Sequence, residues 1–367
     1  MTLYANHKTS KPFDRPDDDK DISTMQIENL IIGAGPGGLA CAKVLAEHAE
    51  NTLVLERKSG IGAKVCAGGI TWSGLISRVP KTLAEQSFCK QIIQTPLQKI
   101  TIEEKTPIIA TVNRKKLGQM MAKQAREAGA AIRTASIVRK IDTNSVIVQN
   151  KKTKKTETIT FTNLIGADGS SSLVRRHLGL KNENSGIGIN YFVAGKSSKM
   201  EWHLNNKLFA NGYAWIFPHA ETISIGAYAP KKSMNPQDLK KALLLWAEKQ
   251  GYSLHKEQAK AEYINFDFQG WNFGKTFLVG DAAGLASGLT GEGIYPAIVS
   301  GEQVARTIID PNHSSDVMDQ LVQKHAKHSK MVELSGKNGI LNAILAELVT
   351  LGLRSGILNF KKLEMAI

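Results

Sequence analysis

The chain has few cysteines and no long apolar run, and both shortages exclude classes of protein. Its 367 residues include three cysteines, Cys41, Cys66 and Cys89, with no CxxC pair among them. This number and spacing exclude a disulfide framework and favour a reducing, cytosolic setting. A spanning helix needs about 18 consecutive apolar residues, and polar residues interrupt the most apolar stretch, 340–358. The sequence therefore predicts no membrane-spanning helix and no metal site.

Acidic residues are scarce relative to basic ones, 33 against 47, which gives a net charge of +14. The excess is concentrated in residues 110–160, which contain 12 basic and 3 acidic side chains. Such a surface either faces a phosphate-bearing partner, such as nucleic acid or an anionic membrane, or is simply solvated. Its densest part, 151–155, has no aromatic residues among the lysines and lies between two strand-like runs. We therefore expect a hairpin loop there and no nucleic-acid partner.

The first 24 residues lack the apolar stretch that a signal peptide requires. They are polar and include five aspartates. We expect them to form a flexible tail on a cytoplasmic protein. The whole chain is 42% hydrophobic and 22% charged, which is an ordinary globular composition.

A glycine-rich turn follows the first apolar run. The run 27–32 ends in the sequence GAGPGG, a helical pattern extends to about His48, and a second strand-like run covers 52–56. In this context GxGxxG predicts dinucleotide binding, because the glycines let the backbone approach a pyrophosphate at a helix N-terminus. A carboxylate at the end of the second strand is placed to bind the adenosine ribose. The residues expected to hold the cofactor here are Gly33, Gly35, Pro36, Gly38, Glu56 and Arg57.

A second glycine cluster lies far downstream and favours FAD over NAD. After the strand-like run 276–279 the chain reads GDAAG, and the sequence GEGI at 291–294 opens a helix that extends to about residue 309. An enzyme with one nicotinamide cofactor needs no second nucleotide-facing turn. Asp281 is expected to hold a ribityl hydroxyl, with an ordinary helix-capping aspartate as the alternative. The helix start can place backbone N–H groups beside the flavin pyrimidine edge. The residues expected there are Gly291, Gly293 and Ile294.

Over roughly residues 26–310, these motifs resemble the FAD-dependent family with the para-hydroxybenzoate hydroxylase fold, and within it the geranylgeranyl reductase family. The segment Ala167-Asp168-Gly169 is similar to the family's DG motif. The sequence KVCAGG at 64–69 resembles the reductases' KxCGGG segment, and YAWIFP at 213–218 matches their YxWxFP motif.

The resemblance implies that the segment 66–69 lies beside the isoalloxazine ring. It also implies that Arg114 contacts FAD, with a surface arginine as the alternative. Cys66 is the candidate catalytic residue, either as a proton donor or as a small polar wall of the cavity, whereas Cys41 is expected in the core. The cofactor contacts implied by the resemblance are Cys66, Ala67, Gly69, Arg114 and Asp168, the last within a supporting turn.

Three aromatic residues alternate in the YAWIFP segment. Tyr213, Trp215 and Phe217 point to one face if the segment is a strand. That face is either an ordinary sheet core or, as the resemblance implies, the wall of a cavity that binds an isoprenoid chain.

The sequence departs from the family pattern at Ala67, Gly288 and His219, where glycine, proline and lysine are usual. Substrate identity therefore does not follow from the resemblance. The favoured function is reduction of carbon–carbon double bonds in an isoprenoid or other apolar substrate. An FAD-dependent monooxygenase acting on an aromatic or polyketide-like substrate is the alternative, and a non-enzymatic binder of prenylated protein is a third reading.

The expected partner is an apolar small molecule or lipid, and the electron donor stays open. No second GxGxxG is present, so NAD(P)H would bind transiently, or a protein or quinone would replace it. A set of apolar residues near the C-terminus follows helical spacing. It predicts either a helix resting on a membrane surface or a helix packed on the core. The set is Leu341, Ile344, Leu345, Leu348 and Leu351.

The order of these segments predicts an α/β fold. We expect a Rossmann-like FAD-binding domain with an inserted antiparallel-sheet substrate domain and a C-terminal helical segment. The FAD-binding domain would comprise 25–80, 105–180 and 270–310, and the substrate domain 81–104 and 181–269. Residues 311–367 would form the helical region, and 1–24 the tail.

Overall fold

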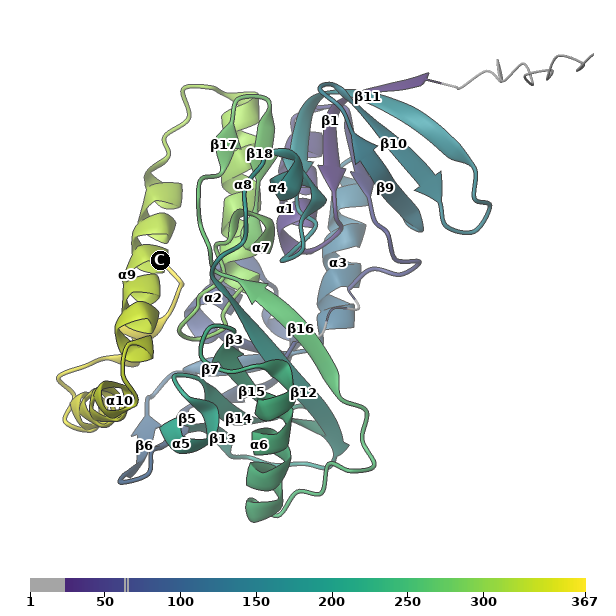
Figure 1. The fold of residues 1–367 in the computed structure, drawn as a ribbon. Coiled ribbons are helices and arrows are strands. Elements are labelled where there is room, and N and C mark those ends of the chain that lie inside the picture. The colour runs from purple at the N-terminus through teal and green to yellow at the C-terminus, as the bar shows by residue number, and fades with distance from the viewer. Residues whose placement is uncertain (1–23, 63, 65) are drawn as a thin grey trace, which may run out of the picture.

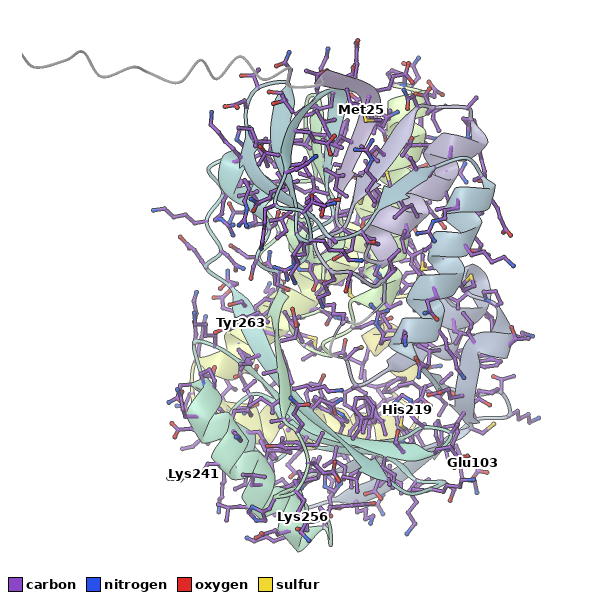
Figure 2. The ribbon with its side chains drawn as sticks, turned by 90° about the vertical axis from the view of Figure 1, so that its right-hand side faces the viewer. Met25, Glu103, His219, Lys241, Lys256 and Tyr263 are labelled. Carbon is purple, nitrogen blue, oxygen red and sulfur yellow. The ribbon has the colours of Figure 1, made fainter. Side chains whose placement is uncertain are left out.

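The computed structural model describes residues 24–62, 64 and 66–367, which form three sheets with helices packed around them (Figure 1). The expected tail therefore lies outside the described residues, apart from Thr24, which begins the first strand. In the side-chain view, Met25 and Lys256 lie toward opposite ends of the molecule, and Tyr263 lies between them (Figure 2).

An eight-stranded sheet forms the nucleotide-binding part. Its strand order is β17-β18-β11-β1-β2-β8, with β10 paired to β11 and β9 to β10. The central pairs, β1 with β11 and with β2, are parallel, as are β2 with β8 and β11 with β18. The strands are β1 (Thr24–Ile32), β2 (Thr52–Leu55), β8 (Ala131–Arg133), β9 (Ser136–Ile141), β10 (Ser145–Asn150), β11 (Thr156–Gly166), β17 (Asn272–Phe273) and β18 (Thr276–Leu278).

The parallel pairing brings four turns together. The carboxyl ends of neighbouring parallel strands lie at one edge of a sheet, and ligands bind in the crevice outside that edge. The turns after β1, β2, β11 and β18 therefore meet, although they come from distant parts of the chain. Helices α1 (Pro36–Glu47) and α8 (Ile294–Ile309) pack against each other, and α3 (Arg114–Glu127) packs against α1. Short helices α4 (Leu173–His177) and α7 (Gly280–Ala283) follow β11 and β18.

A seven-stranded sheet forms the second part, in the order β16-β12-β15-β14-β13-β5-β6. Every neighbouring pair is antiparallel except β13 with β5. Helix α6 (Pro236–Lys249) packs on this sheet through Leu239, Leu243 and Trp246, and α5 (Asn206–Phe209) lies beside it. The strands are β5 (Lys90–Gln94), β6 (Lys99–Glu103), β12 (Ser185–Ala194), β13 (Met200–His203), β14 (Tyr213–Pro218), β15 (Thr222–Pro230) and β16 (Lys260–Asn265).

A small three-stranded sheet and the C-terminal helices complete the fold. The small sheet contains β3 (Gly69–Thr71), β7 (Ile109–Val112) and β4 (Ala84–Phe88), with α2 (Trp72–Arg78) and η1 (Lys81–Leu83) between β3 and β4. The C-terminal region forms α9 (Asp316–Gly336), α10 (Gly339–Arg354) and η2 (Phe360–Leu363). Figure 1 shows α10 at the margin of the molecule, next to α9 and β6.

The structure confirms the predicted α/β fold class, with a mostly antiparallel sheet inserted between parts of the nucleotide-binding sheet. The lysine-rich segment lies in the hairpin between β10 and β11, as expected. Several strands, β9 among them, were not predicted from the sequence. Cys41 is fully buried, and burial raises the pKa of its thiol. The proposed domain boundaries stay a prediction. Among the described residues, no helix is long and apolar enough to cross a membrane.

Candidate functional site

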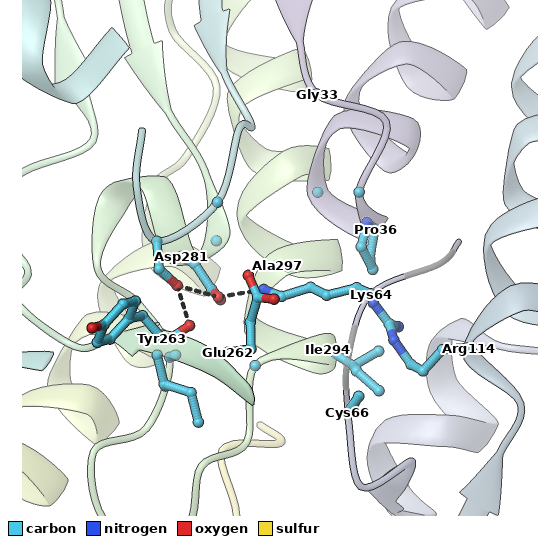
Figure 3. Close-up of a pocket in the computed structure, with 18 of the residues that line it drawn as sticks. Gly33, Pro36, Lys64, Cys66, Arg114, Glu262, Tyr263, Asp281, Ile294 and Ala297 are labelled. Atoms are coloured by element: carbon cyan, nitrogen blue, oxygen red, sulfur yellow. Dashed lines mark hydrogen bonds and ion pairs between the residues drawn. The ribbon is translucent and has the colours of Figure 1, made fainter. Parts of the chain in front are cut away.

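A cavity of about 520 Å³ opens where the parallel strands end and extends to the seven-stranded sheet. This volume falls within the range of small-molecule sites, roughly 300–1,000 Å³. Every site residue predicted from the sequence lines it except Gly38. Residues separated by more than 200 positions therefore meet in one site (Figure 3).

The turn after β1 is packed too closely for side chains. Gly33 has φ of +108°, and a Cβ there would collide with the carbonyl oxygen of Ala167. Gly38 lies behind the turn, where a Cβ would collide with the carbonyl oxygen of Gly33, so its role is helix packing rather than lining. Pro36 begins α1, and no side chain among the described residues caps that helix. Its free N–H groups suit an anion such as a pyrophosphate.

Glu56 immediately follows β2, and its carboxylate fixes the neighbouring loops. Oε2 accepts a hydrogen bond from the backbone N–H of Ala34 (3.0 Å), and Oε1 accepts one from Lys58 N (2.8 Å). The adjacent Arg57 is exposed and also lines the cavity. Glu56 lines the cavity, and ribose binding by its carboxylate stays a prediction.

Asp281 joins three distant segments beside the cavity. Its Oδ2 accepts hydrogen bonds from Lys64 Nζ (2.7 Å) and from Ser170 Oγ (3.0 Å) (Figure 3). Burial by itself would lower the pKa of Lys64, but the attraction and hydrogen bond of Asp281 give it a net raised pKa. The N-cap of α7 is Val279, so Asp281 does not occupy the capping position named as the alternative. Sequence reasoning did not identify Lys64 as a partner, because its contact spans more than 200 residues.

Arg114 is the clearest sign that a polar ligand belongs in the cavity. It is the first residue of α3, whose N-cap is Asn113. Its Nε and Nη1 are buried and have no hydrogen-bond partner in the described part of the chain. Buried polar groups are normally satisfied, so a guanidinium in this state indicates an acceptor supplied by a ligand. This burial does not fit the alternative of a freely solvated surface arginine.

Asp168 supports the turn after β11, as expected. Its Oδ2 accepts a hydrogen bond from the backbone N–H of Leu173 (2.6 Å) at the start of α4. Oδ1 is buried without a partner among the described residues, and burial raises the pKa of this carboxyl group.

The His219 side chain holds the segment around Cys66 in place. Nε2 of His219 lies 2.9 Å from the carbonyl oxygen of Ala67, and Nδ1 lies 2.6 Å from Glu85 Oε2. Gly68 has φ of +84°, and a Cβ there would collide with the His219 ring. The half-buried Cys66 lines the cavity, and its Sγ accepts a hydrogen bond from Gly68 N (3.4 Å). His219, which stands where the family usually has lysine, therefore has a local structural role.

The aromatic residues of β14 form one wall of the cavity. Tyr213, Trp215 and Phe217 lie on one face and belong to a single apolar cluster, so the wall is also a packed core. Trp202 of β13 was missed by sequence reasoning, yet its ring centroid lies 4.8 Å from that of Tyr213 and 5.1 Å from that of Phe217. It stands directly opposite Trp215 across the antiparallel pair. Only knowledge of that pairing could have located it.

Glu292 is a third residue of the cavity lining, after Lys64 and Trp202, that sequence reasoning missed. It lies in the GEGI turn, and burial raises its pKa to about 7. Its Oε2 accepts a hydrogen bond from Met365 N (2.9 Å), and Oε1 accepts one from Thr71 Oγ1 (3.3 Å). Both partners are distant in sequence, so the motif by itself did not indicate a buried carboxyl group.

The fold and the cavity together define a dinucleotide-dependent oxidoreductase. The family model described as FAD binding domain matches residues 26–332, and the chain belongs to this family. It is an FAD-dependent oxidoreductase, and FAD is its cofactor.

Comparison with individual proteins shows which FAD-dependent oxidoreductases this chain resembles. An uncharacterised protein of Methanosarcina barkeri is 30% identical over 310 residues, which are 82% of this chain and 78% of the relative. A digeranylgeranylglycerophospholipid reductase of Methanocaldococcus jannaschii is 28% identical over 83% of this chain and 86% of its own. The crystal structure of a geranylgeranyl bacteriochlorophyll reductase-like protein from Thermoplasma acidophilum has the same fold, with a TM-score of 0.70 and 21% identity over 88% and 96% of the two chains. These comparisons confirm the resemblance to the geranylgeranyl reductase family.

Proposed function

We propose that this protein reduces carbon–carbon double bonds of an isoprenoid lipid of the geranylgeranyl type. The observation that carries the proposal is the continuity of the cofactor turns with a wall of aromatic side chains in one cavity. The digeranylgeranylglycerophospholipid reductases among the relatives support the same substrate class.

The chemistry of an isolated alkene explains why the cofactor turns and the apolar wall are both needed. Such a double bond has no electron sink, so hydride arrival at one carbon requires proton delivery to the other. Reduced FAD, when bound, supplies the hydride. The protein must exclude water and fix the reacting bond, and binding energy from remote isoprene units serves that purpose. The apolar wall formed by Tyr213, Trp215 and Phe217 is suited to such a chain.

The residues that would hold the cofactor lie around the strand ends. The turn at Gly33 and the N-terminus of α1 would face the pyrophosphate, and Glu56 the adenosine ribose. Asp281 would bind the ribityl chain, and the Arg114 nitrogen atoms that have no partner among the described residues would donate to a cofactor acceptor. The GEGI turn before α8 would face the pyrimidine edge of the ring. The electron donor, NAD(P)H or another reductant, is a separate question for experiment.

A chain of hydrogen bonds connects the aromatic wall to the Cys66 segment. Trp215 Nε1 donates to Ser224 Oγ (3.0 Å), which donates to Asn190 Oδ1 (2.7 Å). Asn190 Nδ2 in turn donates to the carbonyl oxygen of Cys66 (3.4 Å). These contacts hold the main chain of Cys66 in a defined relation to the wall, and Cys66 lines the same cavity, which supports it as the group that delivers a proton to the alkene.

The decisive experiment is anaerobic. The purified protein is reduced chemically, a geranylgeranylated lipid is added, and the absorbance of oxidised flavin is followed. Recovery of that absorbance with the unsaturated lipid, but not with its saturated analogue, is the expected result. Reoxidation only when air is admitted, with oxygen consumption stimulated by the substrate, would instead establish a monooxygenase. A protein without bound flavin would favour a binding function.

The role of Cys66 has its own test. Cys66→Ala should lower the rate of flavin reoxidation by lipid by about 100-fold, because a positioned general acid contributes roughly 10²–10⁴-fold. Cys66→Ser should retain part of the rate, and both variants should keep FAD. Full turnover in both variants would remove the thiol from the mechanism and leave proton delivery to water.

A further inference from the structure

Helix α10 presents its apolar side chains to the outside of the molecule. Ile340, Leu341, Ile344, Leu348 and Leu351 on this helix are between 37% and 72% exposed. Leu97, in the turn between β5 and β6, and Ile357, just after the helix, are 83% and 78% exposed. We call these seven residues the α10 patch.

Three polar residues of the same helix face the protein. Glu347 accepts hydrogen bonds from Thr95 Oγ1 (2.9 Å) and Gln98 Nε2 (2.7 Å) of the β5–β6 turn. Asn342 Nδ2 donates to the carbonyl oxygen of Ala210 (2.8 Å), and Thr350 is fully buried. A helix on a water-facing surface normally has the opposite arrangement. The only carboxylate of α10 is thus hydrogen-bonded to the β5–β6 turn, including the backbone N–H of Leu97 (3.2 Å).

The inner side of α10, opposite the patch, packs against residues that line the cavity. The inner side of α10, through Leu353, packs in an apolar cluster with Phe360 and Leu363 of η2 and with Trp202. Phe360, Leu363 and Trp202 also line the cavity. One apolar cluster therefore extends from the inner side of α10, through η2, to Trp202 beside the aromatic wall.

Exposed basic side chains border the patch. Arg354 ends α10, Lys361 lies in η2, and Lys99 lies on β6, which packs against α10. Glu103, an exposed acidic residue on β6, is paired with Lys90 at 3.0 Å. Apolar residues rimmed by basic side chains are the pattern of a helix that lies in the surface of an anionic bilayer. A second protein copy would not account for either the basic rim or the connection to the cavity.

We propose that the α10 patch docks on an anionic phospholipid surface, so that η2 faces the bilayer and an isoprenoid chain passes from the membrane into the cavity. The docking of the patch is independent of the reaction. The passage of the chain rests on the proposed function.

Vesicle flotation tests the docking with the FAD-loaded full chain. The vesicles are phosphatidylcholine alone or phosphatidylcholine mixed with phosphatidylglycerol. The wild type should float with the mixed vesicles. Leu348→Glu should weaken that partition about tenfold or more, because it places a charge on the inserted face. The matched control is Leu245→Glu on α6, where the leucine is 55% exposed against 57% for Leu348, and it should float like the wild type.

A second pair of variants tests the rim. Arg354→Gln combined with Lys361→Gln should weaken binding to the mixed vesicles by about 25-fold, since each basic residue near an anionic surface contributes about 1 kcal/mol, or fivefold. Binding to phosphatidylcholine alone should not change, and added salt should reduce the difference.

Three results would overturn the proposal. The first is a wild type that stays in the unbound fraction with both kinds of vesicle, and the second is a Leu348→Glu variant that floats as well as the wild type. The third is a wild-type dimer in sedimentation that Leu348→Glu converts to a monomer, which would assign the patch to a second copy. An assay with detergent-dispersed lipid separates this proposal from the proposed function. Flavin reoxidation without flotation would contradict docking only, and flotation without reoxidation would contradict the reductase only.

Discussion

The two ends of the cavity are built by different means. The nucleotide end consists mainly of backbone turns that follow parallel strands, with Gly33, Glu56 and Asp281 at their tips. The apolar end consists of large side chains from neighbouring antiparallel strands, such as Trp202 and Trp215. The nucleotide end therefore depends on space near the backbone, and the apolar end depends on the volume and position of side chains. Substitutions at the two ends should separate cofactor binding from substrate binding.

The largest effect is expected at Gly33. In Gly33→Val the new side chain would collide with the carbonyl oxygen of Ala167, and φ of +108° is strained for valine. The purified variant should contain almost no FAD and should lose about 3 kcal/mol of unfolding free energy. The ratio of flavin to protein absorbance measures the first effect. In Gly339→Ala the added Cβ would meet no atom of the described residues within 4 Å beyond its own stretch of helix, so this variant should keep its FAD. Normal FAD content in Gly33→Val would contradict the close approach at this turn.

Arg114→Met should weaken FAD binding about 10- to 100-fold, the range expected when a hydrogen bond from a charged donor is lost. The free protein should not be destabilised, because two of the guanidinium nitrogens are buried without partners among the described residues. Flavin fluorescence titration and thermal unfolding with and without FAD measure the two quantities. Lys116→Met, at an exposed position of the same helix, is the control. Equal loss of stability with and without FAD would indicate a purely structural arginine.

Glu292 lies between the two ends and should make stability depend on pH. Its folded pKa of about 7 exceeds the ordinary value of 4.5, so the folded state binds the extra proton between these pH values. Its contribution to stability is therefore complete below pH 4.5 and declines as the pH rises through 7.

Glu292→Gln removes this titration. The unfolding free energy of Glu292→Gln minus that of the wild type should be about 2 kcal/mol larger at pH 8 than at pH 5. Urea unfolding at both pH values measures the difference. Glu333→Gln, at an exposed position on α9, should show none. A constant difference between Glu292→Gln and the wild type would show that Glu292 is ionised throughout this range.

Trp202→Leu should give the smallest effect, and that effect should be confined to the apolar end. The KM for the isoprenoid lipid should rise about fivefold, because part of the apolar contact is lost, while FAD content stays normal. Trp271→Leu, at a partly buried position packed on the nucleotide-binding core, controls for the general loss of a tryptophan. A drop in FAD content with Trp202→Leu would show that the two ends are not independent.

The sequence predicted the nucleotide end better than the apolar end. The glycine spacing, the strand before it and Glu56 after it are neighbours in the chain, so they predicted the family and the cofactor, which the comparisons confirm. The alternating pattern likewise predicted that Tyr213, Trp215 and Phe217 share a face. Lys64, Trp202 and Glu292 were not identified as members of the site, because their contacts come from segments that the chain brings together only on folding.

The sequence by itself determined which backbone conformations and which amphipathic faces are possible. Glycine at positions 33 and 68 permits positive φ without a Cβ, and this requirement is readable wherever the motif occurs. Tertiary structure decided which faces meet. It paired Asp281 with Lys64 and placed Trp202 opposite Trp215. It also turned the polar side of α10 inward, leaving Leu348 exposed. The physical reason is that helical spacing specifies a face, whereas the partner of that face depends on contacts between residues far apart in the chain.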